Sequence, residues 1–122
     1  MGLLDAWSRR AIERREGRME FLGEQSGSVE ETFKRDLILE FATRPDIRRA
    51  YLANVQFEGQ SEPSTALCIV SQRPDDRSLV LRVGEVSRRR FAKDIPLEVL
   101  FLTAEQEPKI AEVCRPFYSA IY

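Results

Sequence analysis

Apolar side chains recur at helical spacing in four stretches of the chain. Three of these stretches cover residues 3–16, 29–43 and 76–91, and a shorter one follows Pro108. An apolar residue at every third or fourth position is typical of a helix that packs one side against a core. The pattern therefore predicts four helices.

Three further stretches are apolar without helical spacing, and we predict that they are strands. Residues 49–57 alternate, whereas residues 66–70 and 95–102 are almost wholly apolar, as in strands that are buried on both faces. The short loop at residues 58–63 favours an antiparallel first pair, and the helix between the second and third strands favours a parallel pair. The predicted order is α-α-β-β-α-β-α. This is an α/β (α+β) fold with a small mixed sheet of three or more strands.

The sheet needs helical cover on both faces, and the two long helices are the candidates for it. A stretch of linker composition, residues 23–28, separates the first helix from the rest of the chain. We predict an N-terminal amphipathic helical arm and linker over residues 1–27, followed by a single α/β domain over residues 28–122.

Side chains at two predicted helix starts indicate how these helices begin. Ser28 and Glu31 have the spacing of a capping box, in which each side chain bonds the backbone N–H of the other residue. Asp75 or Asp76 is a suitable N-cap for the helix over residues 76–91.

Composition removes several kinds of catalytic site. The chain has no histidine, which excludes Ser-His and Cys-His nucleophile pairs and the usual histidine-bearing zinc sites. Cys68 lies in a predicted buried strand, where burial suppresses thiol reactivity, and Cys114 lies near a helix end that disfavours a thiolate. We assign no catalytic, cofactor-binding or metal-binding residue and expect no cofactor.

The charges of the chain are nearly balanced. Nineteen Lys and Arg against twenty Asp and Glu give a net charge of -1, which argues against a nucleic-acid binder. Arg88, Arg89 and Arg90 form the densest basic cluster, at a helix C-terminus where cations are favoured. We interpret the cluster as a solvated helix end and keep an anion-contacting patch as the functional alternative.

The N-terminal arm is the most informative feature for function. A helix of about fourteen residues that carries Leu3, Leu4 and Trp7 on one face is not stable by itself, so another surface must cover it. That surface is its own core, a second subunit, a partner protein or a membrane. The aromatic tail could form the receiving groove through Phe117, Tyr118 and Tyr122.

The sequence shows no targeting or spanning segment. No stretch approaches the roughly eighteen apolar residues of a membrane span. Asp5 interrupts the apolar run at the N-terminus, so no signal-peptide core is present. We predict a cytoplasmic protein with both thiols free.

Four short motifs resemble a known bacterial family. Asp-Ile-Arg-Arg-Ala-Tyr-Leu-Ala at residues 46–53, Glu62-Pro63, Ile-Pro-Leu-Glu-Val at residues 95–99 and Arg-Pro-Phe-Tyr at residues 115–118 follow one another. This succession resembles the C-terminal domain of the SseB family, the enhanced serine sensitivity proteins, over roughly residues 45–118. The resemblance implies a small α/β module without an assigned reaction or catalytic residue. Family members often carry a separate N-terminal domain, where this sequence has the short arm.

Two functional hypotheses follow from these features. The first is a non-enzymatic protein-interaction or regulatory module, which binds a protein partner or associates with itself through the arm. The alternative is a small-ligand-binding protein or enzyme that uses arginine and carboxylate groups in a cleft beside the sheet. Such clefts lie outside the carboxyl ends of strands, here near residues 71–74 and 103–105.

Overall fold

The computed structural model describes residues 19–90 and 97–120 and gives only the backbone of Arg90. Within these residues, five strands form one mixed sheet and three helices pack on it, which confirms the predicted fold class. In chain order the elements are β1 (Met19–Glu24), α2 (Ser28–Phe41), β2 (Ile47–Phe57), β3 (Ser64–Ser71), α3 (Arg77–Arg90), β4 (Leu97–Phe101), α4 (Glu107–Ala111) and β5 (Tyr118–Ser119).

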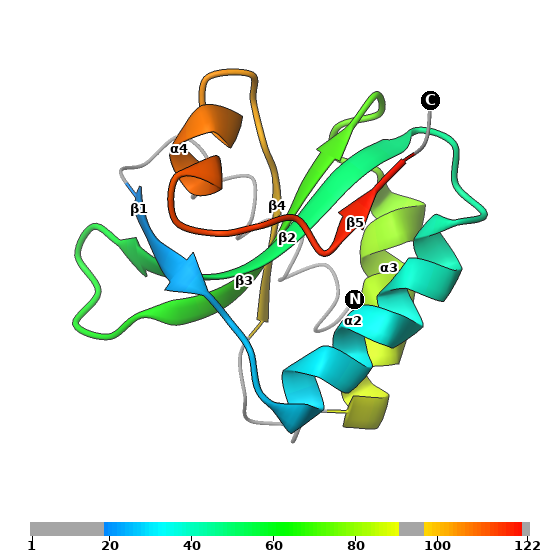
Figure 1. Ribbon diagram of the computed structural model, residues 1–122, viewed down its shortest axis with the longest axis horizontal. Coiled ribbons are helices and arrows are strands. Elements are labelled where there is room, and N and C mark those ends of the chain that lie inside the picture. Colours follow the sequence, from blue (N-terminus) through cyan, green and yellow to red (C-terminus); the bar gives the residue numbers. More distant parts are fainter. Residues whose placement is uncertain (1–18, 91–96, 121–122) are drawn as a thin grey trace.

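Strand β2 is the longest strand and pairs along both of its edges (Figure 1). On one edge it is antiparallel to β3, and β3 is parallel to β4, as the sequence predicts. On the other edge β1 pairs with the C-terminal half of β2 and β5 pairs with its N-terminal half. Between them, the backbone N–H groups of Gln25 and Phe117 donate to the carbonyl groups of Leu52 and Ala50, at 3.0 and 2.9 Å.

Strand β1 is an element that the sequence analysis missed. We placed residues 19–27 in the arm, but Met19–Glu24 is a strand of the sheet. Its side chains alternate between half-buried and exposed, which is the mark of a strand with one covered face. The predicted helix of the arm lies outside the described residues, and the domain boundary at residue 27 stays a prediction.

The helices divide unequally between the two faces of the sheet. We expected the two long helices to cover both faces, but α2 and α3 lie side by side on one face, and the short helix α4 covers the other (Figure 1). The first core contains Phe33, Leu37 and Phe41 of α2 together with Leu79 and Val83 of α3.

The buried apolar residues of α2 are spaced so that they lie on the side of the helix that packs on the sheet. Phe33, Leu37 and Phe41 follow one another every four residues, and all three are fully buried. The ring of Phe41 meets Tyr118 edge-on with centroids 5.5 Å apart, and it lies 6.2 Å from the ring of Phe117. The aromatic tail therefore packs against the same core as α2.

The two predicted helix caps have different outcomes. Asp76 Oδ1 accepts a hydrogen bond from the backbone N–H of Leu79 at 3.3 Å, so Asp76 caps α3 as predicted. The capping box at Ser28 is wrong, because Gly27 occupies the N-cap position of α2 without a side-chain bond. Glu31 instead forms an ion pair with Lys34 at 3.0 Å. In the part of the chain that the structure describes, no helix is long and apolar enough to cross a membrane.

Replacing Phe41 tests the packing of α2 and the tail. Phe41→Ala should lower the free energy of unfolding by about 3–5 kcal/mol, because it leaves a cavity between α2, the sheet and the tail. Val29→Ala at an exposed position of the same helix should change it by less than about 0.5 kcal/mol. Urea unfolding measures both, and equal losses would contradict this packing.

Candidate functional site

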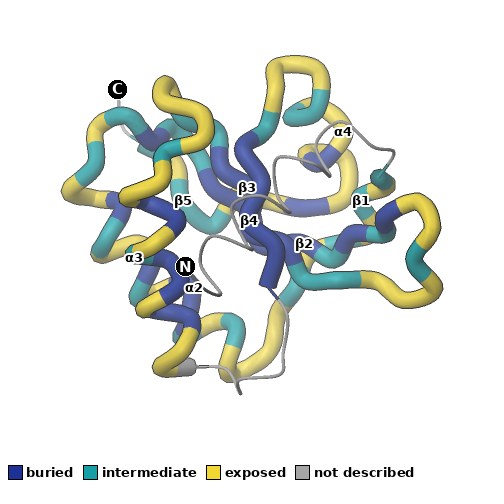
Figure 2. The backbone as a smooth tube through the Cα atoms, turned by 180° about the vertical axis from the view of Figure 1, so that it is seen from behind, coloured by how far each residue is buried: buried dark blue, intermediate teal, exposed yellow. Residues whose placement is uncertain are grey.

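An apolar surface lies on the side of α2 and α3 that faces away from the sheet. We call it the outer helix face. Leu39 is 74% exposed, and Leu81 and Ile38 are 40% and 36% exposed. The exposed positions recur at helical spacing along both helices (Figure 2). The outer helix face consists of Glu31, Arg35, Ile38 and Leu39 of α2, Ala42 at its C-cap, and Ser78, Leu81, Glu85 and Arg88 of α3.

Ion pairs join the two helices beside this surface. Arg82 of α3 donates from Nε to Glu40 of α2 and from Nη1 to Glu85, both at 2.8 Å. Arg44 adds a contact to Glu40 at 3.5 Å. The hydrogen bond from Arg82 holds the pKa of the Glu40 carboxyl below its usual value. The Arg82–Glu40 pair crosses between α3 and α2 and holds the two helices together next to Leu39 and Leu81.

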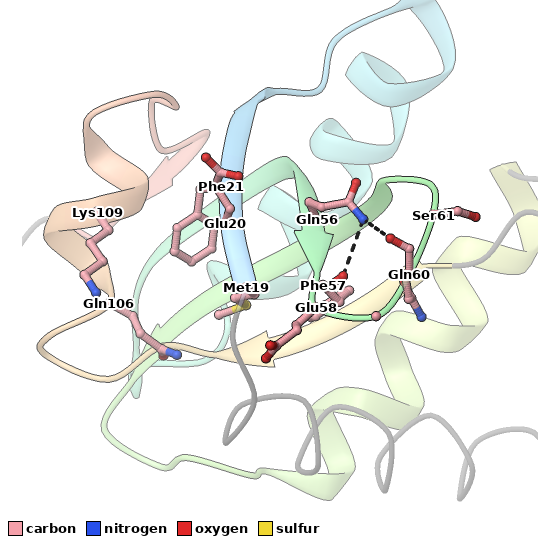
Figure 3. Close-up of a pocket in the computed structure, with 11 residues that line it drawn as sticks. Met19, Glu20, Phe21, Gln56, Phe57, Glu58, Gln60, Ser61, Gln106 and Lys109 are labelled. Atoms are coloured by element: carbon pink, nitrogen blue, oxygen red, sulfur yellow. Dashed lines mark hydrogen bonds between the residues drawn. The ribbon is translucent and has the colours of Figure 1, made fainter.

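A pocket of about 760 Å³ opens between β1, the turn after β2 and α4 (Figure 3). Its apolar part consists of Met19, Phe21 and Phe57, and the side chains of Lys109 in α4 and Gln106 just before α4 also line it. The remaining lining residues are polar except for Gly59 and are Glu20, Gln56, Glu58, Gly59, Gln60 and Ser61. Enclosed apolar walls are typical of small-molecule sites, whereas this pocket is open and rimmed by polar side chains.

The pocket does not lie where the ligand hypothesis expects a cleft. That hypothesis expects one beside the carboxyl ends of β3 and β4, near residues 71–74 and 103–105. The pocket lies instead at the turn between β2 and β3, which is the amino end of β3. Its Gln56 side chain donates to the carbonyl groups of Phe57 and Gln60, which closes that turn.

A hydrogen-bond network on the α4 side of the sheet connects Arg49 and Tyr51 of β2 with Glu107. Arg49 donates from Nε and Nη2 to the two carboxylate oxygens of Glu107, the second bond being 2.9 Å. The Tyr51 hydroxyl also donates to Glu107, at 2.7 Å. These bonds tie the first residue of α4 to β2. Because 58 residues separate Arg49 from Glu107, sequence reasoning had no signal for this pair.

The network changes the acidity of its members. The hydrogen bond from Arg49 lowers the pKa of Glu107, and burial, followed by the bond to Glu107, raises the pKa of Tyr51 to about 12. Both Glu107 oxygens are occupied and the phenol is neutral at ordinary pH. The arrangement holds α4 in place.

Both cysteines are free and buried. Burial raises the pKa of the Cys68 thiol, and it raises the pKa of Cys114 to about 11. Cys114 Sγ donates to the carbonyl group of Leu52 at 3.6 Å. The searched residues, 19–90 and 97–120, contain no group of three His, Cys, Asp or Glu side chains that could hold a metal ion.

The structure places only part of the predicted interaction surface. Phe117 and Tyr118 are half-buried and pack on Phe41, and the Tyr118 hydroxyl donates to the Phe41 carbonyl at 3.4 Å. Leu3, Leu4, Trp7 and Tyr122 lie outside the described residues. A groove that these aromatic residues form for the arm stays a prediction.

The predicted anion patch lies in the last turn of α3. Arg88 and Arg89 are exposed there, and Arg90 is the last residue of the helix. The carboxylate of Glu85, one turn before Arg88 and Arg89, is bound by Arg82. An anion contact at Arg88 stays a prediction. The exposure of Leu39 and Leu81 is the feature that sequence reasoning missed, because the apolar spacing of α2 and α3 pointed only to their buried sides.

The Glu107 network predicts part of the acid sensitivity of the protein. A carboxyl group with a lowered pKa stabilises the fold above its ordinary value of 4.5, and this stabilisation is lost as the pH falls through the folded-state pKa. Glu107→Gln should therefore destabilise the protein at pH 7 and flatten the decline in stability below about pH 4.5. Urea unfolding between pH 2 and pH 7 measures both effects.

Glu105→Gln is the matched control, because Glu105 is exposed and makes no ion pair with the described residues. This variant should follow the wild-type curve. Identical pH curves for wild type and Glu107→Gln would show that the pair does not stabilise the fold.

Comparison with known proteins gives one match. A family model described as the SseB protein C-terminal domain matches residues 25–119. No curated protein and no solved structure matches the chain.

Proposed function

We propose that this chain, which belongs to the SseB C-terminal domain family, is a non-enzymatic protein-interaction module. The family model matches residues 25–119. Its contact surface is the outer helix face. The single observation that carries the proposal is the exposure of Leu39, a leucine in the last turn of α2 that is 74% exposed to water.

The exposed leucines resemble the apolar centre of a protein–protein interface. Burying a leucine side chain contributes about 1.5–3 kcal/mol, and a lone exposed leucine needs no explanation. Here Leu39 and Leu81 are exposed on the outer sides of two neighbouring helices, and charged side chains lie beside them in the sequence. An apolar centre with a polar rim is typical of protein–protein contacts.

The arm is the second part of the proposed interaction. Leu3, Leu4 and Trp7 form an apolar stripe that requires cover, either from a protein partner or from a second copy of the chain. We place this interaction in the bacterial cytoplasm. The two buried free thiols support that location, since reducing compartments keep cysteines unpaired.

Substitution of Leu39 tests the proposal. Leu39→Arg should remove captured partner proteins when the tagged chain is incubated with a lysate of its source cells, because a charge replaces the apolar centre. Val113→Arg is the matched control, since Val113 is 40% exposed on the opposite side of the sheet. Urea unfolding must show that both variants stay folded.

Quantitative mass spectrometry of the captured proteins is the readout. Equal recovery with wild type, Leu39→Arg and Val113→Arg would overturn the outer helix face as the contact surface. Trp7→Ala in the same experiment reports on the arm, and its expected result is weaker capture with an unchanged fold.

The charged side chains that line the pocket favour small-ligand binding as a second candidate function. Glu20, Glu58 and Lys109 line it, and none of them makes an ion pair with another described residue, so their charges are available to a zwitterionic metabolite. A thermal-shift screen with amino acids and other small metabolites tests this. We expect a ligand-dependent rise in Tm that Lys109→Met abolishes, and no shift in the whole screen would remove this candidate.

A further inference from the structure

We infer that the outer helix face binds a second copy of this chain, in a two-fold dimer in which α2 of each protomer packs antiparallel on α3 of its partner. The inference rests on the proposed function and names the partner. Three features of α2 and α3 support it: their directions, their apolar centres and the order of their charges.

The directions of the two helices follow from the sheet. Helix α2 folds back on β2 through a short turn and therefore runs antiparallel to β2, as β3 does. Helix α3 links the parallel strands β3 and β4 and therefore runs antiparallel to β3. The two helices are antiparallel neighbours (Figure 1). A two-fold axis parallel to them brings α2 of one protomer onto α3 of the other in antiparallel orientation.

The apolar residues and charges then match in one register. In an antiparallel pair centred on Leu39 and the partner's Leu81, the residue four positions before Leu39 meets the residue four positions after Leu81. These residues are Arg35 and the partner's Glu85. One turn further, Glu31 lies opposite the partner's Arg89 and the adjacent Arg88. Both charge pairs are therefore of opposite sign.

The two arginines are available for these contacts. Neither Arg35 nor Arg88 makes an ion pair with any other residue in 19–90 or 97–120, although both are exposed. Glu31 and Glu85 already bind Lys34 and Arg82, but a carboxylate accepts several hydrogen bonds. Arg88 thus contacts an anion, as the sequence suggested, and that anion is a carboxylate of the partner.

A two-fold dimer in which α2 packs on its own copy lacks this charge pairing for Arg35. If α2 packed antiparallel on its own copy about Leu39, Arg35 would face Thr43 and would meet no charge. The pairing of α2 with the partner's α3 gives Arg35 a carboxylate, and two-fold symmetry makes every contact twice.

Sedimentation velocity of the purified full chain over a concentration series tests the inference. Wild type should change from the mass of one chain to that of two. Arg35→Glu and Glu85→Arg should each weaken association by about tenfold, because each substitution turns two symmetric attractions into repulsions. The double variant Arg35→Glu/Glu85→Arg should restore association. Arg115→Glu, a charge reversal outside the outer helix face, should leave it unchanged.

Disulfide trapping distinguishes the two arrangements. Leu39→Cys and Leu81→Cys protomers should form a linked dimer when mixed under oxidising conditions, and neither should link efficiently alone. The native thiols do not interfere, because Cys68 and Cys114 are buried. Linking of Leu39→Cys to itself would overturn the proposed pairing.

The outcomes separate this inference from the proposed function. A wild type that stays monomeric at every concentration overturns self-association. If Leu39→Arg still loses captured proteins in that case, the protein-interaction function stands with a different partner. A dimer whose charge variants do not restore association overturns the register.

Discussion

A sheet that is apolar on both faces is the constraint on which the rest of this structure depends. Leu67 and Ile69 of β3 point to one face and Ala66 and Cys68 point to the other, and all four are fully buried. Water must be kept from both faces, since each exposed apolar side chain costs free energy in proportion to its area. Two long helices cover one face. On the other, the cover among the described residues centres on a helix of only five residues, α4.

This unequal cover explains where the polar interactions lie. A five-residue helix buries too little area to be held by apolar contacts alone, and the Glu107 network provides a directed attachment to β2. The long helices need no such anchor on their inner side, where Phe33, Leu37 and Leu79 are fully buried. Their outer side is left with leucines that the fold itself does not use.

The sequence predicts the parts of this fold that depend on local patterns. The spacing of Phe33, Leu37 and Phe41 predicts α2, and the helix between β3 and β4 predicts their parallel pairing. The sequence analysis missed strand β1, although Met19 and Phe21 alternate with acidic or exposed positions, because Gly23 within the strand and Gly27 after it are typical of a linker. The Glu107 network and the outer helix face could not be predicted, because they depend on which elements become neighbours.

The shared edge of β2 has a consequence for the order in which the chain is synthesised. Strands β1, β2 and β3 leave the ribosome early and can pair at once. The carbonyl groups of Arg48 and Ala50 stay unpaired until Phe117 and Ala120 have been synthesised. Until then, one half of the longest strand presents an open edge, to which other nascent chains can add. The interval between translation of β2 and of β5 is therefore the period in which this protein most needs a chaperone.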